Sequence, residues 1–223
     1  MNEEITNKSG KSDNSDTVNN AENGRRTDKK MNLPNKLTIF RILLVPAFMI
    51  FIYIYSPSGW SNIVAALLIL VAAVTDLADG IIARKHNLVT NFGKLMDPLA
   101  DKFMVVGALI AITASESFAD MRFLSVWVTA GVFFRELAVT SVRLVANTSE
   151  GKVIAASFIG KIKTFVQVFC IMTVLLEGVI LTPLLGTPEN VFGYVTMSLM
   201  LAVTVYSGFD YLKNYWKYID PSK

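Results

Sequence analysis

Cysteine, histidine and charged side chains are all scarce in this 223-residue sequence. The one cysteine, Cys170, cannot form a disulfide within the chain, and its apolar surroundings predict a buried thiol. The one histidine, His86, excludes a histidine-rich metal site. Only 17% of the residues are charged and 52% are hydrophobic, whereas about a quarter of the residues in soluble domains are charged. The composition predicts a membrane protein, and a net charge of +3 does not indicate nucleic-acid binding.

Residues 1–30 contain few apolar side chains. They contain four apolar residues, and their six acidic and six basic side chains balance. Such a segment cannot bury enough surface to offset the entropy lost on folding, so we expect a disordered polar tail. It has no apolar run like that of a secretory signal peptide. We expect the tail to be dispensable, with a regulatory role as the alternative.

Long apolar blocks follow the tail. A helix needs about 20 residues to cross the hydrocarbon core of a bilayer, and backbone groups there must be paired within the segment. We expect an all-α, polytopic membrane fold with a short interfacial helix in 31–38, six transmembrane helices in 39–215 and a cytoplasmic C-terminus in 216–223. The third block is short unless it begins near Gly93. The six blocks are 37–55, 62–83, 99–115, 121–146, 155–182 and 190–212.

Lysine and arginine are unequally distributed between the connections. They gather before the first block, between the second and third, around the fourth connection and after the sixth, whereas the alternate connections contain only Arg122. The positive-inside rule therefore places both termini in the cytoplasm. Lys36 and Arg41, where the first block begins, are expected to be available to anionic headgroups.

Four aspartates interrupt the apolar pattern at the cytoplasmic side of the second and third blocks. Asp76 and Asp79 are three residues apart and Asp97 and Asp101 are four apart, so each pair occupies one face of its helix. Charged side chains in a membrane are costly, by about 2.5–3.5 kcal/mol, and indicate function. Oxygen ligands suit Mg²⁺, with Mn²⁺ as an alternative. A purely structural alternative is a salt-bridge cluster of the aspartates with three nearby cations, Arg84, Lys94 and Lys102.

The spacing of these residues resembles the signature of the CDP-alcohol phosphotransferase family. The matching run is Asp76-x₂-Asp79-Gly80-x₂-Ala83-Arg84-x₈-Gly93-x₃-Asp97-x₃-Asp101. The resemblance covers about residues 32–215 and implies a six-helix fold, a cytoplasmic site in a bacterial cell membrane and a homodimer.

The resemblance also implies the roles of individual residues. Asp76, Asp79, Asp97 and Asp101 would hold two ions per site, Mg²⁺ or Mn²⁺, with Asp101 also the general base. The metal ions would bind the diphosphate of CDP-diacylglycerol. The acceptor alcohol would then attack the phosphorus that carries the lipid, and CMP would leave. The CDP-lipid would be bordered by a further set of matching residues: Asn35, Thr38, Arg41, Gly80, Ala83, Arg84 and Gly93.

The acceptor is indicated by cations on the same side as the aspartates. Arg135 lies well inside the fourth block, Arg143 lies nearer its end, and Lys161 begins the fifth. Arginine suits bidentate capture of phosphate, although Glu136 could simply pair with Arg143. Lys163 and Lys152 could equally be ordinary cytoplasmic cations of the kind that the positive-inside rule predicts, with no part in phosphate binding.

Local stretches resemble the bacterial branch of the family that uses sn-glycerol 3-phosphate. They are 32–41, 97–102, 135–143 and 160–164. By that resemblance Arg135, Arg143 and Lys161 would hold the acceptor phosphate. Branches that form cardiolipin or phosphatidylinositol phosphate remain alternatives, and so do two other classes, a cation-coupled transporter and a catalytically inactive scaffold. The transporter reading is disfavoured because no paired repeat appears, and the scaffold reading because every motif aspartate is present.

Overall fold

The structure is a computed structural model that describes residues 32–54, 56, 58–85, 90–150 and 158–215. For residues 83–85, 91, 94, 143–150, 158–162 and 214–215 it describes the backbone but not the side-chain surroundings. The tail expected over 1–30, His86 and the expected C-terminal segment 216–223 lie outside the described residues.

Six long helices make up most of the described chain, in the order expected from the apolar blocks. They are α2 (Leu33–Tyr53), α3 (Trp60–Lys85), α4 (Asn91–Ala114), α5 (Arg122–Glu150), α6 (Phe158–Leu176) and α8 (Val191–Tyr215). Short helical turns join them, namely η1 (Glu116–Met121), η2 (Glu177–Leu181) and α7 (Thr182–Leu185). All regular structure in the described residues is helical, which confirms the all-α fold.

Five segments are long and apolar enough to cross a membrane. They are Leu33–Tyr53, Trp60–Ile82, Glu116–Val142, Lys163–Leu185 and Val191–Lys213. The remaining long helix, α4, has 24 residues, which corresponds to about 36 Å, but its apolar part includes Asp97, Asp101 and Lys102. The helix that contains the third expected block therefore begins near Gly93, at Asn91, but the charges of the motif keep it out of the five candidate spans, so its crossing of the membrane stays a prediction.

The separate interfacial helix expected over 31–38 is not present in the described part of that segment. Leu33 to Thr38 instead form the first turns of α2, which continues without interruption to Tyr53. Pro34 does not break the helix because a proline in the first turn leaves no intrahelical hydrogen bond unmade. As a result Asn35, Thr38 and Arg41 all project from one rigid element.

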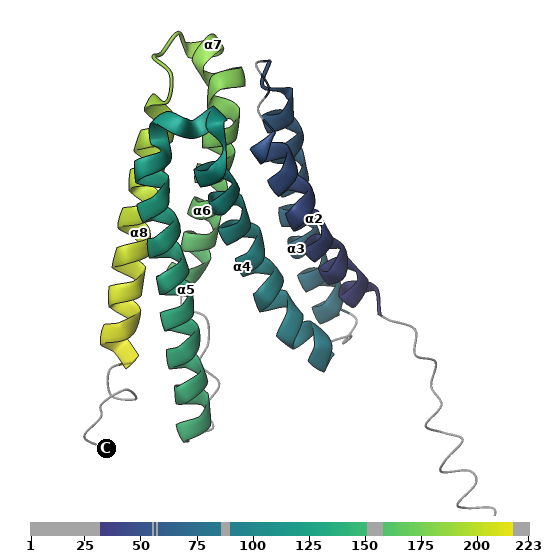
Figure 1. Cartoon of the computed structure of the whole chain (residues 1–223). Coiled ribbons are helices and arrows are strands. Elements are labelled where there is room, and N and C mark those ends of the chain that lie inside the picture. Colours follow the sequence, from purple (N-terminus) through teal and green to yellow (C-terminus); the bar gives the residue numbers. More distant parts are fainter. Residues whose placement is uncertain (1–31, 55, 57, 86–89, 151–157, 216–223) are drawn as a thin grey trace, which may run out of the picture. The chain divides into compact units, whose positions relative to one another are not determined.

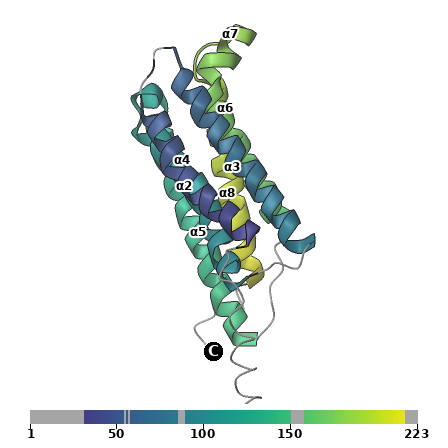
Figure 2. The ribbon, with the colours of Figure 1, turned by 90° about the vertical axis from the view of Figure 1, so that its right-hand side faces the viewer.

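The helices run alongside one another, with α2 packed on α3 and α4, and α5 packed on α4 and α8 (Figures 1 and 2). The starts of α2, α4 and α6 and the ends of α3, α5 and α8 lie at one end of the helical unit (Figure 1). We call this the aspartate end. The alternation of helix directions follows from the short connections between consecutive helices.

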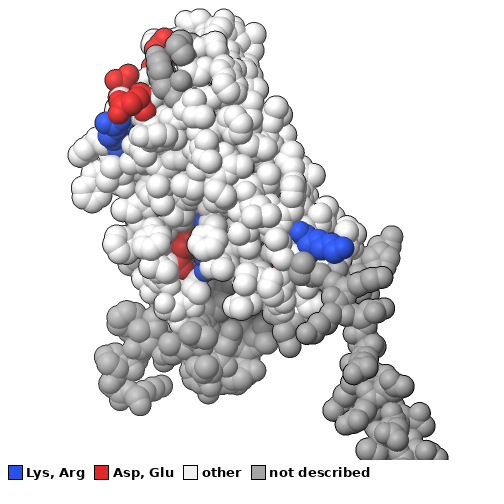
Figure 3. Space-filling model, turned by 45° about the vertical axis from the view of Figure 1, so that its right-hand side comes forward, with Lys and Arg blue, Asp and Glu red and all other residues white. Residues whose placement is uncertain are grey.

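The interior is apolar and the exterior is too, as expected for a protein surrounded by lipid. Phe48, Ile69, Ile112 and Leu175 belong to one continuous buried cluster, and Cys170 is fully buried as predicted. Large hydrophobic side chains are also exposed on every long helix. Figure 3 shows a face that is almost entirely uncharged, with acidic and basic side chains confined to a few small groups.

Candidate active site

The motif aspartates come from two helices that meet the start of α2 at the aspartate end. Asp76 and Asp79 lie in the last three turns of α3, and Asp97 and Asp101 lie in the first three turns of α4. Asp101 is close enough to Asp76 to interact with it electrostatically, and Asp79 is similarly close to Asp97. The two pairs therefore lie near each other, at the same end of their helices.

Arg41 is the cation that pairs with the aspartates of α3. Its Nη1 atom lies 2.6 Å from Asp76 Oδ1, and its Nη2 donates to Asp79 Oδ2. The Arg41 side chain is fully buried, as is most of Asp79, whereas 43% of the Asp76 side chain is exposed. A buried guanidinium with two carboxylates satisfies the requirement that charges in an apolar interior be paired.

This pairing corrects one expectation about Arg41. Arg41 is not available to lipid headgroups, because no part of its side chain is exposed. Of the three cations named as structural partners of the aspartates, Lys102 donates to Thr140 on α5 and is also close enough to Asp101 to interact with it electrostatically, while the side chains of Arg84 and Lys94 lie outside the described residues. The useful signal in the sequence was the position of Arg41 inside an apolar block, where a charge requires a partner.

The first turns of α2 also hold the start of α4. Thr38 Oγ1 donates to Asp97 Oδ1 at 2.7 Å, and Thr90 Oγ1 donates to Asn35 Oδ1 at 2.8 Å. Thr90 is the N-cap of α4, and its hydroxyl accepts the Gly93 N–H at 3.0 Å. Asn35 and Thr38 are buried, so these contacts fix where α4 begins and how Asp97 is oriented.

Gly93 allows a close approach between α2 and the start of α4. A Cβ atom at this position would lie 3.3 Å from Asn35 Oδ1, 3.3 Å from Thr90 Oγ1 and 3.6 Å from Asp97 Oδ2. The first two distances are tight, so Asn35 and Thr90 would have to shift by a few tenths of an ångström, whereas the third is an ordinary contact. Gly80, directly after Asp79, is half-buried in α3, while the side chains of Ala83 and Arg84 are not described.

The donor chemistry of the site fits a divalent cation, but the described side chains are not gathered around one point. Within the described residues, no three Asp, Glu, His or Cys side chains are grouped closely enough to hold an ion. The reason is visible in the contacts, since Asp76 and Asp79 are directed to Arg41 and Asp97 to Thr38. A bound cation would have to compete with Arg41 for the carboxylates of α3.

A second charged cluster lies beside the aspartates on α5 and α6. Glu136 Oε1 accepts from Arg135 Nη1 at 3.2 Å and also from Lys163 Nζ, and all three side chains are largely buried. Asp101 and Lys163 are close enough to interact electrostatically. Two of the three expected phosphate ligands, Arg143 and Lys161, are among the residues whose side-chain surroundings the structure does not describe. Lys163, for which a positive-inside role was an equal alternative, is instead a buried member of this cluster.

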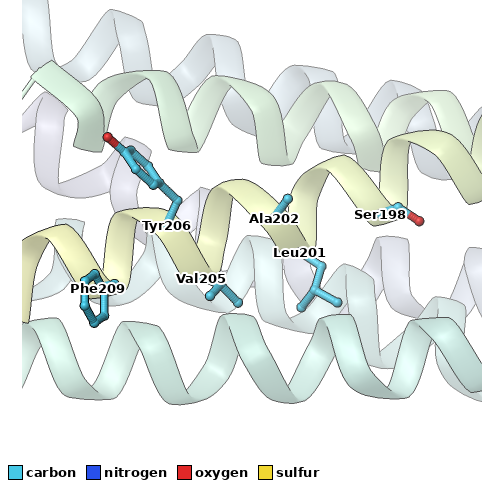
Figure 4. Close-up of a pocket in the computed structure, with 6 residues that line it drawn as sticks. All are labelled: Ser198, Leu201, Ala202, Val205, Tyr206 and Phe209. Atoms are coloured by element: carbon cyan, nitrogen blue, oxygen red, sulfur yellow. The ribbon is translucent and has the colours of Figure 1, made fainter.

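A shallow apolar groove runs along α8, and its Phe209 end adjoins Gly208, which packs against the side chain of Arg135. It is lined by Ser198, Leu201, Ala202, Val205, Tyr206 and Phe209 (Figure 4). Its lining contains two hydroxyl groups and no carboxylate or cation, so it lacks groups that could hold a metal ion or a phosphate.

Comparison with known proteins gives a consistent result along the chain. Residues 31–206 match the family described as CDP-alcohol phosphatidyltransferase. The chain is 37% identical over 205 residues to the CDP-diacylglycerol–glycerol-3-phosphate 3-phosphatidyltransferase of Bacillus subtilis, covering 86% of this chain and 98% of that protein. It is 38% identical over 183 residues to a probable phosphatidylglycerophosphate synthase of Mycobacterium tuberculosis, covering 81% and 80%. It is 39% identical over 142 residues to the Escherichia coli CDP-diacylglycerol–glycerol-3-phosphate 3-phosphatidyltransferase, covering 62% and 73%. Because residues 31–206 match this family and relatives at 37% and 38% identity are covered over most of their length, the chain belongs to the CDP-alcohol phosphatidyltransferase family.

Proposed function

We propose that this protein transfers the phosphatidyl group of CDP-diacylglycerol to sn-glycerol 3-phosphate, producing phosphatidylglycerophosphate and CMP. The observation that carries the proposal is the similarity to the Bacillus subtilis enzyme, because it extends over 98% of that protein. The buried cations beside the aspartates support an acceptor that carries a phosphate. Cardiolipin formation and transfer to inositol phosphate are the alternatives within the family.

The reaction requires that one phosphorus–oxygen bond form and another break. A hydroxyl oxygen of glycerol 3-phosphate would bond to the phosphorus that carries diacylglycerol, the bond from that phosphorus to the CMP oxygen would break, and the hydroxyl proton would pass to Asp101. Asp76, Asp79, Asp97 and Asp101 would hold two divalent cations, Mg²⁺ or Mn²⁺. When bound, these ions would supply charge neutralisation and orientation of the reacting oxygens.

The residues of the chain would position the two substrates from different helices. Asn35, Thr38 and Arg41 on α2 border the aspartates and would lie beside the CDP-lipid, together with Gly80, Ala83, Arg84 and Gly93. Arg135, Arg143 and Lys161 would hold the acceptor phosphate. Asp101 is close enough to Asp76 and to Lys163 to interact with both electrostatically, and it would lie between the two substrates. Such a place between donor and acceptor suits a general base.

The site would face the cytoplasm of a bacterial cell, in its cell membrane, and the protein would function as a homodimer. The orientation follows from the lysine and arginine content of the connections at the aspartate end. Soluble glycerol 3-phosphate could reach such a site directly from the cytoplasm, while CDP-diacylglycerol would enter from the membrane.

The decisive test of an enzyme against a transporter or an inactive scaffold is CMP release. Purified full-length protein in detergent would be mixed with CDP-diacylglycerol and glycerol 3-phosphate, with and without Mg²⁺. We expect CMP only when the acceptor and the metal ion are both present. No release under any metal condition would refute the proposed activity. Asp79→Asn should remove most of the activity. The matched control is Asp120→Asn, which removes an exposed acid at the end of the helices opposite the aspartate end and should keep full activity.

A further inference from the structure

Helices α6 and α8 are joined by a buried carboxylate at the end opposite the aspartate end. The side chain of Glu177 accepts the backbone N–H groups of Phe192 at 2.7 Å and Gly193 at 2.6 Å, in the first turn of α8. Glu177 is 1% exposed. Gly193 leaves room for this contact, because a Cβ atom there would lie 2.8 Å from Glu177 Oε2. Since α6 and α8 pack on each other and run in opposite directions (Figure 1), this contact fixes which of their residues lie at the same level.

From this contact, a stripe of buried residues runs along each helix towards the aspartate end. The residues of each stripe are alternately three and four apart, which is the spacing of one face in packed helices. Counted from the contact, Gln167 is ten residues along α6 and Thr204 is eleven along α8, so both lie about 15–17 Å from it. The stripes are Glu177, Val174, Cys170, Gln167 and Lys163 towards and along α6, and Gly193, Met197, Met200, Thr204 and Ser207 on α8.

The stripes change from apolar to polar where Gln167 and Thr204 reach the same level. One turn nearer the contact, Cys170 and Met200 are fully buried and apolar. Gln167 and Thr204 are 2% and 1% exposed, yet Gln167 Nε2 and Thr204 Oγ1 have no hydrogen-bond partner within the described residues. Buried polar groups are nearly always hydrogen-bonded, because leaving them unpaired is costly. An amide donor and a hydroxyl group at one level of one interface therefore require a common partner.

A single water molecule has the hydrogen-bonding groups that this level requires. Its oxygen can accept from Gln167 Nε2, and it can donate to Thr204 Oγ1 or accept from it. Its remaining hydrogen can bond to a backbone carbonyl oxygen, which has two lone pairs. Buried waters typically have two to four such partners, whereas purely apolar cavities stay dry. Both side chains are neutral, so a neutral occupant is favoured over an ion.

We propose that a water molecule is bound between α6 and α8, where it bridges Gln167 Nε2 and Thr204 Oγ1. The site requires neither substrate nor metal ion, so it is independent of the proposed function. It would hold the aspartate end of α6 to α8 by hydrogen bonds, one turn from Lys163. Towards the other end the same two helices are held by apolar contacts and by the Glu177 carboxylate.

The direct test is an experimental structure of the full-length wild-type protein at a resolution that shows ordered waters. We expect density for a water within about 2.7–3.2 Å of both the Gln167 amide and the Thr204 hydroxyl. A direct hydrogen bond between the two side chains would overturn the proposal, and so would the absence of density between them.

Thermal unfolding in detergent provides an independent test through a double-mutant cycle. Gln167→Met and Thr204→Val each remove one polar group with little change in size. If a water bridges the two groups, each single change leaves it and the other group short of a partner, and should lower the Tm by about 2–6 °C. The double variant should lie close to the single variants, because the bridge is already lost in each.

The opposite result is expected if the two groups are simply unpaired. Replacing an unpaired buried polar group by an apolar one removes an unfavourable group, so both single variants would then have a raised Tm. A raised Tm in both, or losses that add in the double variant, would overturn the proposal. The matched control is Thr173→Val on α6, because the Thr173 hydroxyl already donates to the Phe169 carbonyl oxygen at 2.9 Å. Its effect should add to that of Gln167→Met. If a variant does not fold, the wild-type structure decides.

Discussion

The buried position of Arg41 makes a strong prediction about stability in the absence of metal. Replacing it by glutamine removes the positive charge that pairs with Asp79, whose side chain is only 7% exposed. Breaking a buried ion pair from one side costs about 3–5 kcal/mol, because the remaining charge stays buried without a partner. The pairing with Asp76 adds less, since 43% of that side chain is exposed and screened by solvent.

For a protein of this size, 1 kcal/mol corresponds to a change of about 2–4 °C in Tm. Arg41→Gln should therefore lower the Tm in EDTA by about 6–20 °C. Added Mg²⁺ should recover more of the loss in this variant than it adds to wild type, because a cation bound by the aspartates would replace the missing charge. The assay is thermal unfolding of purified protein in detergent, followed by the fluorescence of its three tryptophans.

The matched control is Arg122→Gln. Arg122 pairs with Glu116 at 2.9 Å, but 44% and 74% of these side chains are exposed, and exposed pairs contribute about 0–1 kcal/mol. Its Tm should stay within about 4 °C of wild type. The reasoning would be refuted if Arg41→Gln unfolded at the same temperature as the control, or if Mg²⁺ stabilised both variants equally.

Four further predictions concern activity. Activity should vanish in EDTA and return with Mg²⁺ or Mn²⁺, and full turnover in chelator would contradict a metal-dependent site. Asp101→Asn should lower kcat by about two or more orders of magnitude while metal-dependent CDP-diacylglycerol binding stays nearly intact; near-normal kcat would exclude it as the base. Arg135→Ala should raise the KM for glycerol 3-phosphate about tenfold or more, whereas an equal change in both KM values would remove it from the phosphate site. A chain starting at Met31 should insert and turn over normally, and loss of activity in inserted protein would make the tail structural or regulatory.

The sequence was sufficient to predict the helices and the position of the aspartates. Apolar blocks of span length and two pairs of acids at helical spacing are local properties, and they required no knowledge of packing. Even the early start of α4 has a local cause, since Thr90 caps it three residues before Gly93. The start of α4 lies eight residues before the expected block, and the other helix boundaries differ from the expected ones by six residues or fewer.

The pairing of charges between helices could not be predicted in the same way. Arg41 and Asp79 are 38 residues apart and Lys163 and Glu136 are 27 apart, so each pair depends on how two helices are rotated against each other. Sequence spacing suggested Arg143 as a partner of Glu136 because both lie on nearly the same face of one helix, and that pairing stays a prediction because the Arg143 side chain lies outside the described residues. The structure adds two partners of Glu136 that spacing did not suggest, its neighbour Arg135 and Lys163 across the helix interface. A buried charge predicts that a partner exists, but packing decides which one.

The identity of the lipid product tests the proposed function most directly. Purified protein would be incubated with CDP-diacylglycerol, Mg²⁺ and one acceptor at a time: glycerol 3-phosphate, inositol phosphate, phosphatidylglycerol, serine or water alone. The lipid extract would then be analysed by mass spectrometry. We expect phosphatidylglycerophosphate from glycerol 3-phosphate, at a rate well above that with any other acceptor, and no product in Asp79→Asn. Formation of cardiolipin, phosphatidylinositol phosphate or phosphatidylserine as the preferred product would contradict the account.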